Sequence, residues 1–376
     1  MRDAARIAGE AMYYSSDAVG MVMAVVRGGD SISLGFGRLN RSKPVDPKNP
    51  KDPNLPKGDT IVRLGSISKV MTGQILAALS QPPWSTPLTL NHVVSDYLPA
   101  RIPPFPPGQT PGAWPREVVF IDLATHTAGT PRDIPVEECK PPLPPYCHFD
   151  REHYTSWLKT FQLPYRPGTV ANYSNAGFGL LGMAMEKFSG RLYSDLLKAY
   201  VSVPLKMADT IVVPPWTGMS EDLRGRFMVG YDEGRPVPAE WNGTDVMQPS
   251  GGVLSTADDM AKWLIHNLQA SDGLGPTTAL AQAIYVARPR LNAVIALDSP
   301  GRQLDGLGLG WEINFASGSR PMIIQKTGAF SGFMAYVAFA PGRDVGVFFA
   351  LNKIDVPVLF NLMDQANNLI AGLATR

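Results

Sequence analysis

Neither sign of charge is in excess in this sequence. Its 34 lysines and arginines balance 33 acidic residues, which gives a formal net charge of +1, and no basic run interrupts that balance. Because phosphate binding needs a positive electrostatic footprint, we expect no nucleic-acid partner. With 44% apolar and 18% charged residues, the composition is typical of a globular protein and excludes a disordered or fibrous one.

Long hydrophobic runs are also missing. The longest apolar stretch near the N-terminus, residues 18–26, ends in Arg27-Gly28-Gly29-Asp30 and predicts a strand followed by a turn. It is too short to span a bilayer, so we expect no transmembrane segment. No leader pattern precedes it, but Met1 can be an expression start that replaces a removed leader. The N-terminus therefore leaves the localisation open.

Cysteine is nearly absent, and the two that occur, Cys139 and Cys147, flank four prolines in ECKPPLPPYC. Two alternatives stay open: separate thiols in a reduced compartment, or a disulfide that indicates an oxidising compartment such as a periplasm. No HExxH motif or paired CxxC motif is present, so we expect no metal, and the sequence indicates no other cofactor. The oligomeric state is open.

The strand patterns concentrate at the two ends of the chain. After a helix-like segment at 3–14, two apolar strand patterns flank Gly28-Gly29-Asp30, and residues 333–353 repeat the design before a helical tail at 356–373. The middle is mostly helical pattern interrupted by proline-rich loops such as 99–115. We predict an α+β fold, with an antiparallel sheet formed from both chain ends and flanked by helices. The sheet subdomain would comprise 1–70 and 250–376, and 71–249 would be an inserted, mostly helical subdomain with the site in the cleft between them.

The segment LGSISKVMTGQILAAL carries an SxxK motif, Ser66 to Lys69, where an extended stretch ends at Gly65 and helical spacing begins. Helical side chains three residues apart share a face and lean toward the N-terminus, so the Lys69 amine should point at the Ser66 hydroxyl. A desolvated lysine beside another cation can activate such an alcohol, and first-turn amides can hold an oxyanion. The same pattern recurs at Ser156 to Lys159, where charged neighbours predict an amphipathic surface helix instead.

A second motif, YxN, places Tyr173 and Asn175 between a Pro-Gly loop and a Gly-rich helix. A phenol near Lys69 can share its proton transfer, and an amide can bind a substrate carbonyl while it steadies the lysine. The competing interpretation is a buried tyrosine beside an asparagine that caps a helix. Histidines offer no clear base: we expect His126 to be a core or supporting residue, and His148 with His153 to be a solvated surface pair.

The third motif is KTG, inside an apolar strand pattern. Lys326 can supply a fixed positive charge for a substrate carboxylate, Thr327 a hydroxyl, and Gly328 room for close backbone approach. The backbone N–H of Ala329 can be the second oxyanion donor, and the strand edge can pair with an extended acyl chain. The alternative is an exposed lysine at a strand bulge. SxxK, YxN and KTG are weak separately but strong in this order, and no GxSxG elbow supports an α/β-hydrolase.

At these residues the chain resembles class C serine β-lactamases and low-molecular-mass penicillin-binding proteins. DLATHTAGTPRDIP, YSNAGFGLLG, PLKMADT, SGGVLSTADDMAKWL, GLGLGW and IIQKTG are similar to blocks of the AmpH-type D-alanyl-D-alanine carboxypeptidase/endopeptidases, from about residue 60 onward. The resemblance implies that Ser66 is the nucleophile, that Lys69 with Tyr173 is the base, that Asn175 contacts the substrate amide, and that Lys326 and Thr327 recognise a carboxylate.

The resemblance also implies a periplasmic enzyme with peptidoglycan stem peptides as substrates and β-lactams as pseudo-substrates. A class C-like β-lactamase, an esterase or D-amino-acid amidase, and a protein that only binds cell-wall fragments remain alternatives. One departure bears on them: where the lactamases usually carry a glutamine after LATHTAG, this chain reads PRDIP. Asp133 or Arg132 would occupy that place, which argues against efficient β-lactam turnover.

Overall fold

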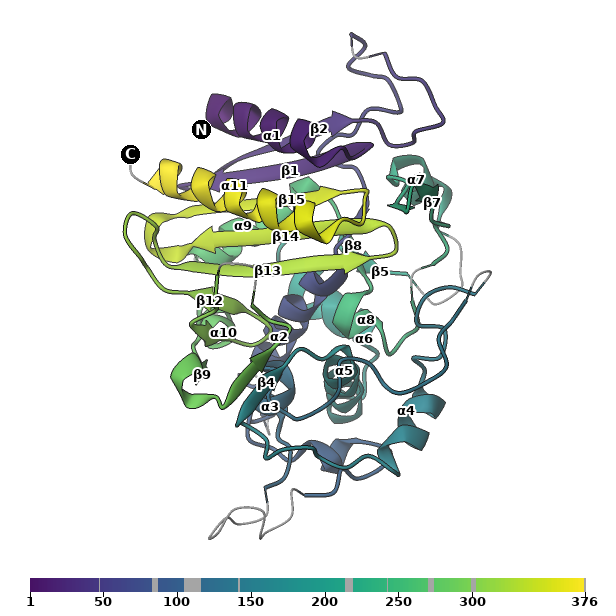
Figure 1. Ribbon diagram of the computed structural model, residues 1–376, viewed down its shortest axis with the longest axis vertical. Helices are drawn as coiled ribbons and strands as arrows, with labels where there is room; N and C mark the ends of the chain where they lie inside the picture. Colours follow the sequence, from purple (N-terminus) through teal and green to yellow (C-terminus); the bar gives the residue numbers. More distant parts are fainter. Residues whose placement is uncertain are drawn as a thin grey trace.

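The computed structural model describes residues 1–46, 48–82, 87–104, 116–140, 143–213, 219–241, 243–269, 274–298 and 302–374 (Figure 1). Most of the expected proline-rich loop at 99–115, from residue 105 onward, lies outside these residues. None of the helices within them has the length and apolar character that a bilayer crossing requires.

The main sheet has eight strands in the order β2-β1-β15-β14-β13-β12-β11-β9, and every neighbouring pair is antiparallel. The strands are β1 (Gly20–Arg27), β2 (Asp30–Gly37), β9 (Val286–Ala287), β11 (Gly306–Leu307), β12 (Glu312–Asn314), β13 (Ile323–Phe330), β14 (Phe333–Ala340) and β15 (Val345–Leu351). Because β1 pairs with β15, the two chain ends form one sheet, which confirms the predicted fold class.

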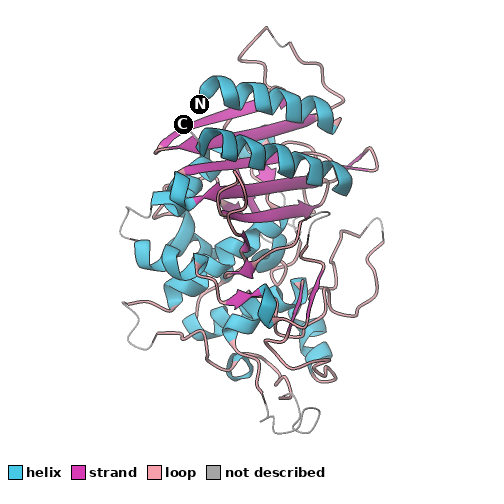
Figure 2. Ribbon diagram, turned by 60° about the vertical axis from the view of Figure 1, so that its left-hand side comes forward, coloured by secondary structure: helices cyan, strands magenta, loops and turns pink. Residues whose placement is uncertain are grey.

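Both faces of the central strands are covered, which explains their uninterrupted apolar sequence. Along β1, Met21 and Met23 face a cluster shared with α1 (Arg2–Ser16) and α11 (Val356–Ala374), while Val22 and Ala24 face the cluster that contains Trp263. Trp263 belongs to α9 (Ala257–Gln269), which packs on β1 and β15. Figure 2 shows α1 and α11 side by side across one face of the sheet.

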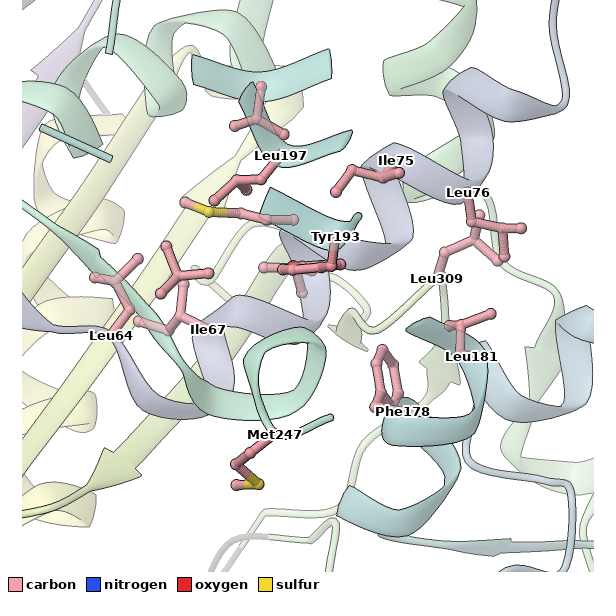
Figure 3. Packing of buried hydrophobic residues seen from close by; sticks show 14 of the residues in the cluster. Leu64, Ile67, Ile75, Leu76, Phe178, Leu181, Tyr193, Leu197, Met247 and Leu309 are labelled. Carbon is pink, nitrogen blue, oxygen red and sulfur yellow. The ribbon is translucent and has the colours of Figure 1, made fainter. Parts of the chain in front are cut away.

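Helix α2 (Ser68–Leu79) is the centre of the part between the two ends. All its residues except Ala78 are buried, and its polar side chains, such as Lys69 and Gln74, form hydrogen bonds within the interior. Figure 3 shows Ile75 and Leu76 of α2 among side chains of other elements, including Phe178 and Tyr193. Helices α5 (Asn175–Ser189), α6 (Tyr193–Leu197), α8 (Gln248–Gly251) and α10 (Gly275–Gln282) contact α2. The other helices of the described residues outside the sheet layers are α3 (Phe120–Ala124), α4 (Arg151–Leu158) and α7 (Glu221–Arg226).

The other elements of the described residues are short. Three small sheets contain β3 (Val62–Arg63), β4 (Val170–Asn172), β5 (Ile211–Val212), β6 (Tyr231–Asp232), β7 (Arg235–Pro236), β8 (Val253–Ser255) and β10 (Ala293–Ile295). The short helical segments are η1 (Gly65–Ile67), η2 (Val94–Tyr97), η3 (Lys198–Ser202), η4 (Arg288–Arg290) and η5 (Pro341–Arg343). The division into subdomains at residues 70 and 250 stays a prediction.

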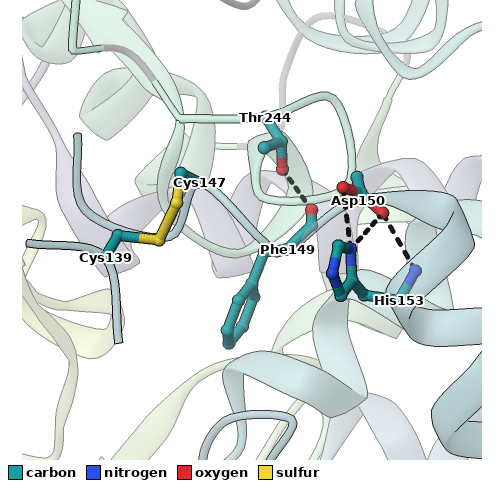
Figure 4. The surroundings of a disulfide bond; sticks show 6 residues. All are labelled: Cys139, Cys147, Phe149, Asp150, His153 and Thr244. Atoms are coloured by element: carbon teal, nitrogen blue, oxygen red, sulfur yellow. Dashed lines mark hydrogen bonds and ion pairs between the residues drawn. A yellow bond between two sulfur atoms is a disulfide. The ribbon is translucent and has the colours of Figure 1, made fainter. Parts of the chain in front are cut away.

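The two cysteines are joined in a disulfide, which decides between the two alternatives for this pair (Figure 4). The bond closes a loop that leads directly into α4, whose N-cap is Asp150. His153 in α4 contacts that carboxylate through Nδ1 at 2.8 Å, and its ring lies 5.0 Å from the ring of His148. Both histidines are partly exposed, in agreement with the predicted surface pair.

Candidate active site

Ser66 lies in the tight turn η1, which runs straight into α2. The helix was expected to begin at Ser66, and the structure differs because this turn precedes it. Gly65 adopts a positive φ of 53°, and a Cβ there would lie 2.6 Å from the backbone nitrogen of Ala329. Glycine is therefore required by both the backbone conformation and the close approach of β13.

The Lys69 side chain is fully buried and points back at the Ser66 hydroxyl, as the helical spacing predicted. Its Nζ donates to Ser66 Oγ at 3.2 Å, to Asn175 Oδ1 at 2.7 Å and to the backbone oxygen of Ser250 at 2.7 Å. Burial lowers the pKa of Lys69 to about 8, although the nearby Tyr173 opposes that shift. Lys69 can therefore exchange a proton close to neutral pH.

Tyr173 follows β4, and its hydroxyl donates to Ser66 Oγ at 2.5 Å. Burial alone would raise the pKa of Tyr173, but the ammonium groups of Lys69 and Lys326 bring it below its ordinary value. The side chain that caps α5 is Ser174, which accepts from the Gly177 N–H. The competing interpretation of Asn175 as the cap is therefore wrong.

Lys326 is also fully buried, so the alternative of an exposed lysine is wrong as well. Its Nζ donates to Glu312 Oε1 at 2.5 Å, and lies 5.0 Å from the centre of the Tyr173 ring. Burial would lower the pKa of Lys326, but the charge of Glu312 and the hydrogen bond to it raise the pKa above its ordinary value. Lys326 is thus a permanent cation whose charge is largely balanced by Glu312.

The backbone of β13, the strand that carries the KTG motif, contacts the turn η1 that contains Ser66. A Cβ on Gly328 would lie 1.9 Å from the Leu64 carbonyl oxygen and 3.3 Å from the Ser66 nitrogen, which confirms the predicted close approach. β12 pairs with β13 only as far as Gln325, so from Lys326 onward no strand in the described part of the chain pairs with that side of β13. Ala329 is exposed there.

These groups meet at a cavity of about 160 Å³. It is lined by Ser66, Arg132, Tyr173, Ala296, Leu297, Asp298, Glu312, Thr327, Gly328, Ala329, Leu359 and Phe360. A larger hollow of about 590 Å³ beside α6 has none of the predicted site residues in its lining. We assign the chemistry to the smaller cavity, because Ser66, Tyr173 and the KTG strand line it, and Lys69 contacts Ser66 from behind.

The Beta-lactamase family model matches residues 5–371 of the chain. The chain belongs to this family. It is 32% identical to the D-alanyl-D-alanine-carboxypeptidase/endopeptidase AmpH of Escherichia coli K12, over 96% of this chain and 87% of that protein. It is 27% identical to a Beta-lactamase of Yersinia enterocolitica, over 78% of this chain and 74% of that protein.

Solved structures of the beta-lactamase family agree with this assignment. A Beta-lactamase/D-alanine Carboxypeptidase from Yersinia pestis, complexed with citrate, superposes with a TM-score of 0.81 and 26% identity, covering 98% of each chain. A class C beta lactamase from Rhodobacter sphaeroides superposes with a TM-score of 0.71 and 25% identity, over 97% of this chain and 99% of that one. The chain is a serine hydrolase of this fold.

Some residues of this family site were not singled out from the sequence. Glu312 directly follows the GLGLGW block, but nothing in the sequence shows that its carboxylate is buried against Lys326. Ser250 contributes only a backbone oxygen, which no sequence motif reports. Of the two candidates for the lactamase glutamine, Asp133 accepts from Asn175 Nδ2 at 2.8 Å, while the Arg132 guanidinium lies 5.0 Å from the Tyr173 ring centre.

The remaining sequence candidates do not contact Ser66. His126 is buried, its Nδ1 accepts from the Ser174 N–H at 3.0 Å, and its ring lies 4.8 Å from the Tyr173 ring, tilted by 30°. Burial holds the pKa of His126 well below its ordinary value, so it is neutral and supports the tyrosine, as expected of a core residue. Ser156 and Lys159 are both exposed on the surface at α4, as predicted.

Proposed function

We propose that this protein is a D-alanyl-D-alanine carboxypeptidase/endopeptidase that works through an acyl-enzyme on Ser66, and that β-lactams acylate the same serine. The observation that carries the proposal is that Lys69 Nζ and Tyr173 OH both contact Ser66 Oγ. The similarity to AmpH over nearly the whole chain supports the choice of substrate. Peptidoglycan stem peptides would supply the D-alanyl-D-alanine terminus.

In the first half-reaction, Ser66 Oγ attacks the carbonyl carbon of the penultimate D-alanine. Its proton passes to the coupled pair of Lys69 and Tyr173, whose two pKa values are both below their ordinary values. The pair then returns that proton to the leaving nitrogen as the C–N bond breaks and D-alanine departs. In the second half-reaction, water adds to the ester carbonyl and gives a proton to the same pair. The C–O bond to Ser66 then breaks, and the pair passes this proton to Ser66 Oγ.

The developing oxyanion would be bound by the backbone N–H groups of Ser66 and Ala329. The contact between η1 and β13 supports this assignment, because Gly65 and Gly328 bring the two backbones together. Two preorganised donors at such a position commonly lower a barrier by several kcal/mol, about 3 to 4 kcal/mol for each. The unpaired side of β13 would hold the extended acyl chain by backbone hydrogen bonds.

Carboxylate recognition is the proposed role of Lys326 and Thr327. Thr327 lines the cavity, and Lys326 lies behind it with Glu312 as its partner. Because Glu312 balances much of that charge, the substrate carboxylate would gain further attraction from Arg132, whose side chain is 59% exposed in the same cavity. Asn175 would contact the substrate amide.

The proposed location is the periplasm, where peptidoglycan is accessible. The disulfide between Cys139 and Cys147 supports it, because such bonds persist in oxidising compartments and are rare in reduced ones. Fractionation of the native host followed by detection of the protein would test the proposal, and recovery in the cytoplasmic fraction alone would contradict it.

A β-lactamase is the second candidate, because several relatives carry that name. The test compares D-alanine release from a pentapeptide ending in D-alanyl-D-alanine with steady-state nitrocefin hydrolysis on one preparation, with Ser66→Ala as the control. An opened β-lactam keeps its leaving nitrogen tethered, and Asp133 or Arg132 would take the place of the glutamine that the lactamases usually carry. If that change costs about 3 to 4 kcal/mol in deacylation, nitrocefin turnover will be a few hundredfold below that of an efficient lactamase. Fast nitrocefin turnover without D-alanine release would make this protein a β-lactamase.

A further inference from the structure

The segment before Asp133 is built into the N-terminal end of α5. The backbone oxygen of Arg132 accepts from the Asn175 N–H at 2.7 Å, and the Pro131 oxygen accepts from Ser174 Oγ at 2.5 Å. The Arg132 oxygen thus pairs with an amide of the first turn of α5, which has no partner within the helix. Asp133 consequently has a fixed place beside Asn175 instead of a variable one on a loop.

The Asp133 carboxylate determines which way round the Asn175 amide lies. A carboxylate can only accept, so the amide must turn its Nδ2 toward Asp133, at 2.8 Å from Oδ1. Its oxygen then faces Lys69 Nζ at 2.7 Å. With the amide turned over, its NH₂ group would face an ammonium and its oxygen would face a carboxylate. Both contacts would be repulsive, so Lys69 and Asp133 together fix the observed orientation of the Asn175 amide.

The orientation of Asn175 in turn holds Lys69 against the nucleophile. Lys69 Nζ has three acceptors, and two of them, the Ser250 backbone oxygen and Asn175 Oδ1, aim its remaining N–H at Ser66 Oγ. The other hydrogen on Asn175 Nδ2 is then left for a substrate carbonyl. Because Asp133 polarises that NH₂ group, its hydrogen bond to substrate is strengthened as well.

We propose that Asp133 is a positioning residue for acylation, acting through Asn175 on Lys69. This inference rests on the proposed function, since it concerns the same serine. It gives a definite role to one of the two candidates for the place of the lactamase glutamine. A glutamine can present either an oxygen or an NH₂ group to Asn175, whereas a carboxylate presents oxygen alone. Asp133 thus fixes one amide orientation where an amide side chain would permit two.

A double-mutant cycle on the full chain tests this coupling. The second-order rate constant for acylation by a fluorescent penicillin is measured for wild type, Asp133→Ala, Asn175→Ala and the double variant, with melting temperatures as the check on folding. We expect Asp133→Ala to slow acylation about tenfold and Asn175→Ala about a hundredfold, and the double variant to match Asn175→Ala within about twofold. Asp133→Asn keeps the volume and one acceptor, so its rate should lie between those of wild type and Asp133→Ala.

Two outcomes would overturn the inference. Losses that multiply fully in the double variant would show that Asp133 acts independently of Asn175, as a purely structural residue would. An Asp133→Ala protein that is folded and acylates at the wild-type rate would show that it has no role. The matched control is Glu137→Gln. It removes the charge of an exposed acidic side chain four residues after Asp133 and should leave the acylation rate unchanged. A wild-type protein that takes no label would instead refute the proposed function.

Discussion

The chain contains the same four-residue pattern, serine followed three positions later by lysine, in two helical regions with opposite surroundings. Lys69 has no exposed surface and three hydrogen-bond acceptors, whereas Ser156 and Lys159 are both exposed at α4. Burial lowers the pKa of Lys69 to about 8. The chemistry therefore comes from the desolvated environment and not from the spacing, which both regions share.

The most severe test of this contrast exchanges each serine for alanine. Ser66→Ala should abolish covalent labelling by penicillin, because no other hydroxyl in the described site contacts both Lys69 and Tyr173. Ser156→Ala should label like the wild type. Intact-protein mass spectrometry measures both, and an undiminished mass gain in Ser66→Ala would sink the assignment of the nucleophile.

Exchanging the lysines should give the next largest difference. Lys69→Met should slow acylation about a thousandfold, within the ~10²- to 10⁴-fold range of general-base catalysis, while Lys159→Met should have no effect. The acylation rate constant is again the measurement, with circular dichroism as the check that Lys69→Met is folded. Similar rates for the two variants would mean that burial of Lys69 has no catalytic value.

The pH dependence follows from the same burial. A base with a pKa of about 8 is mostly protonated below that pH, so the free-base fraction falls about tenfold for each pH unit lost. The acylation rate constant should therefore rise about fiftyfold from pH 6 to pH 8, where half of the base is free, and level off above about pH 9. Stopped-flow measurement of penicillin acylation provides this profile. A profile that is flat between pH 6 and 8 would place the base elsewhere.

The second buried lysine should affect selectivity more than attack. A desolvated ion pair is typically worth ~2 to 5 kcal/mol, so Lys326→Ala should reduce the preference for carboxylate-bearing substrates over neutral esters at least tenfold. Glu312 would then be buried without its partner, which can cost ~3 to 5 kcal/mol of stability. The Lys326→Ala, Glu312→Gln double variant removes that cost. If the double variant loses activity equally on carboxylate-bearing substrates and on neutral esters, Lys326 acts in proton transfer or in maintaining the structure instead.

The smallest effect is expected at the disulfide loop, which joins the rim of the site to α4. Its Tyr146 ring lies 6.1 Å from the ring of Phe330, next to Ala329. Closing so short a loop is worth about 2.5 kcal/mol, so Cys139→Ser with Cys147→Ser should lower the melting temperature by a few degrees and change penicillin labelling less than threefold. Alkylation of the unreduced, denatured wild type should add no mass, and two adducts would refute the bond.

The sequence was sufficient where a pattern alone determines the structure. Uninterrupted apolar strands at both ends indicated a shared, covered sheet, and the spacing of Ser66 and Lys69 indicated which atoms meet. The sequence was insufficient where the role of a side chain depends on whether it is buried. Lys326 and Lys159 are the same residue type, and only the tertiary packing makes one a fully desolvated cation paired with Glu312. The orientation of the Asn175 amide likewise depends on Asp133, a neighbour 42 residues away in the sequence.

The pairing of β1 with β15 also dictates when catalytic competence can arise during synthesis. A nascent chain that has emerged as far as residue 250 contains Ser66, Lys69, Tyr173 and Asn175, but it lacks β13 and with it Lys326 and Ala329. In the sheet, β13 pairs with β14, β14 pairs with β15, and β15 pairs with β1. Such non-local pairing is slow to form. A chain that lacks the last strands therefore has Ser66 without a complete oxyanion site, and activity arises only when those strands dock.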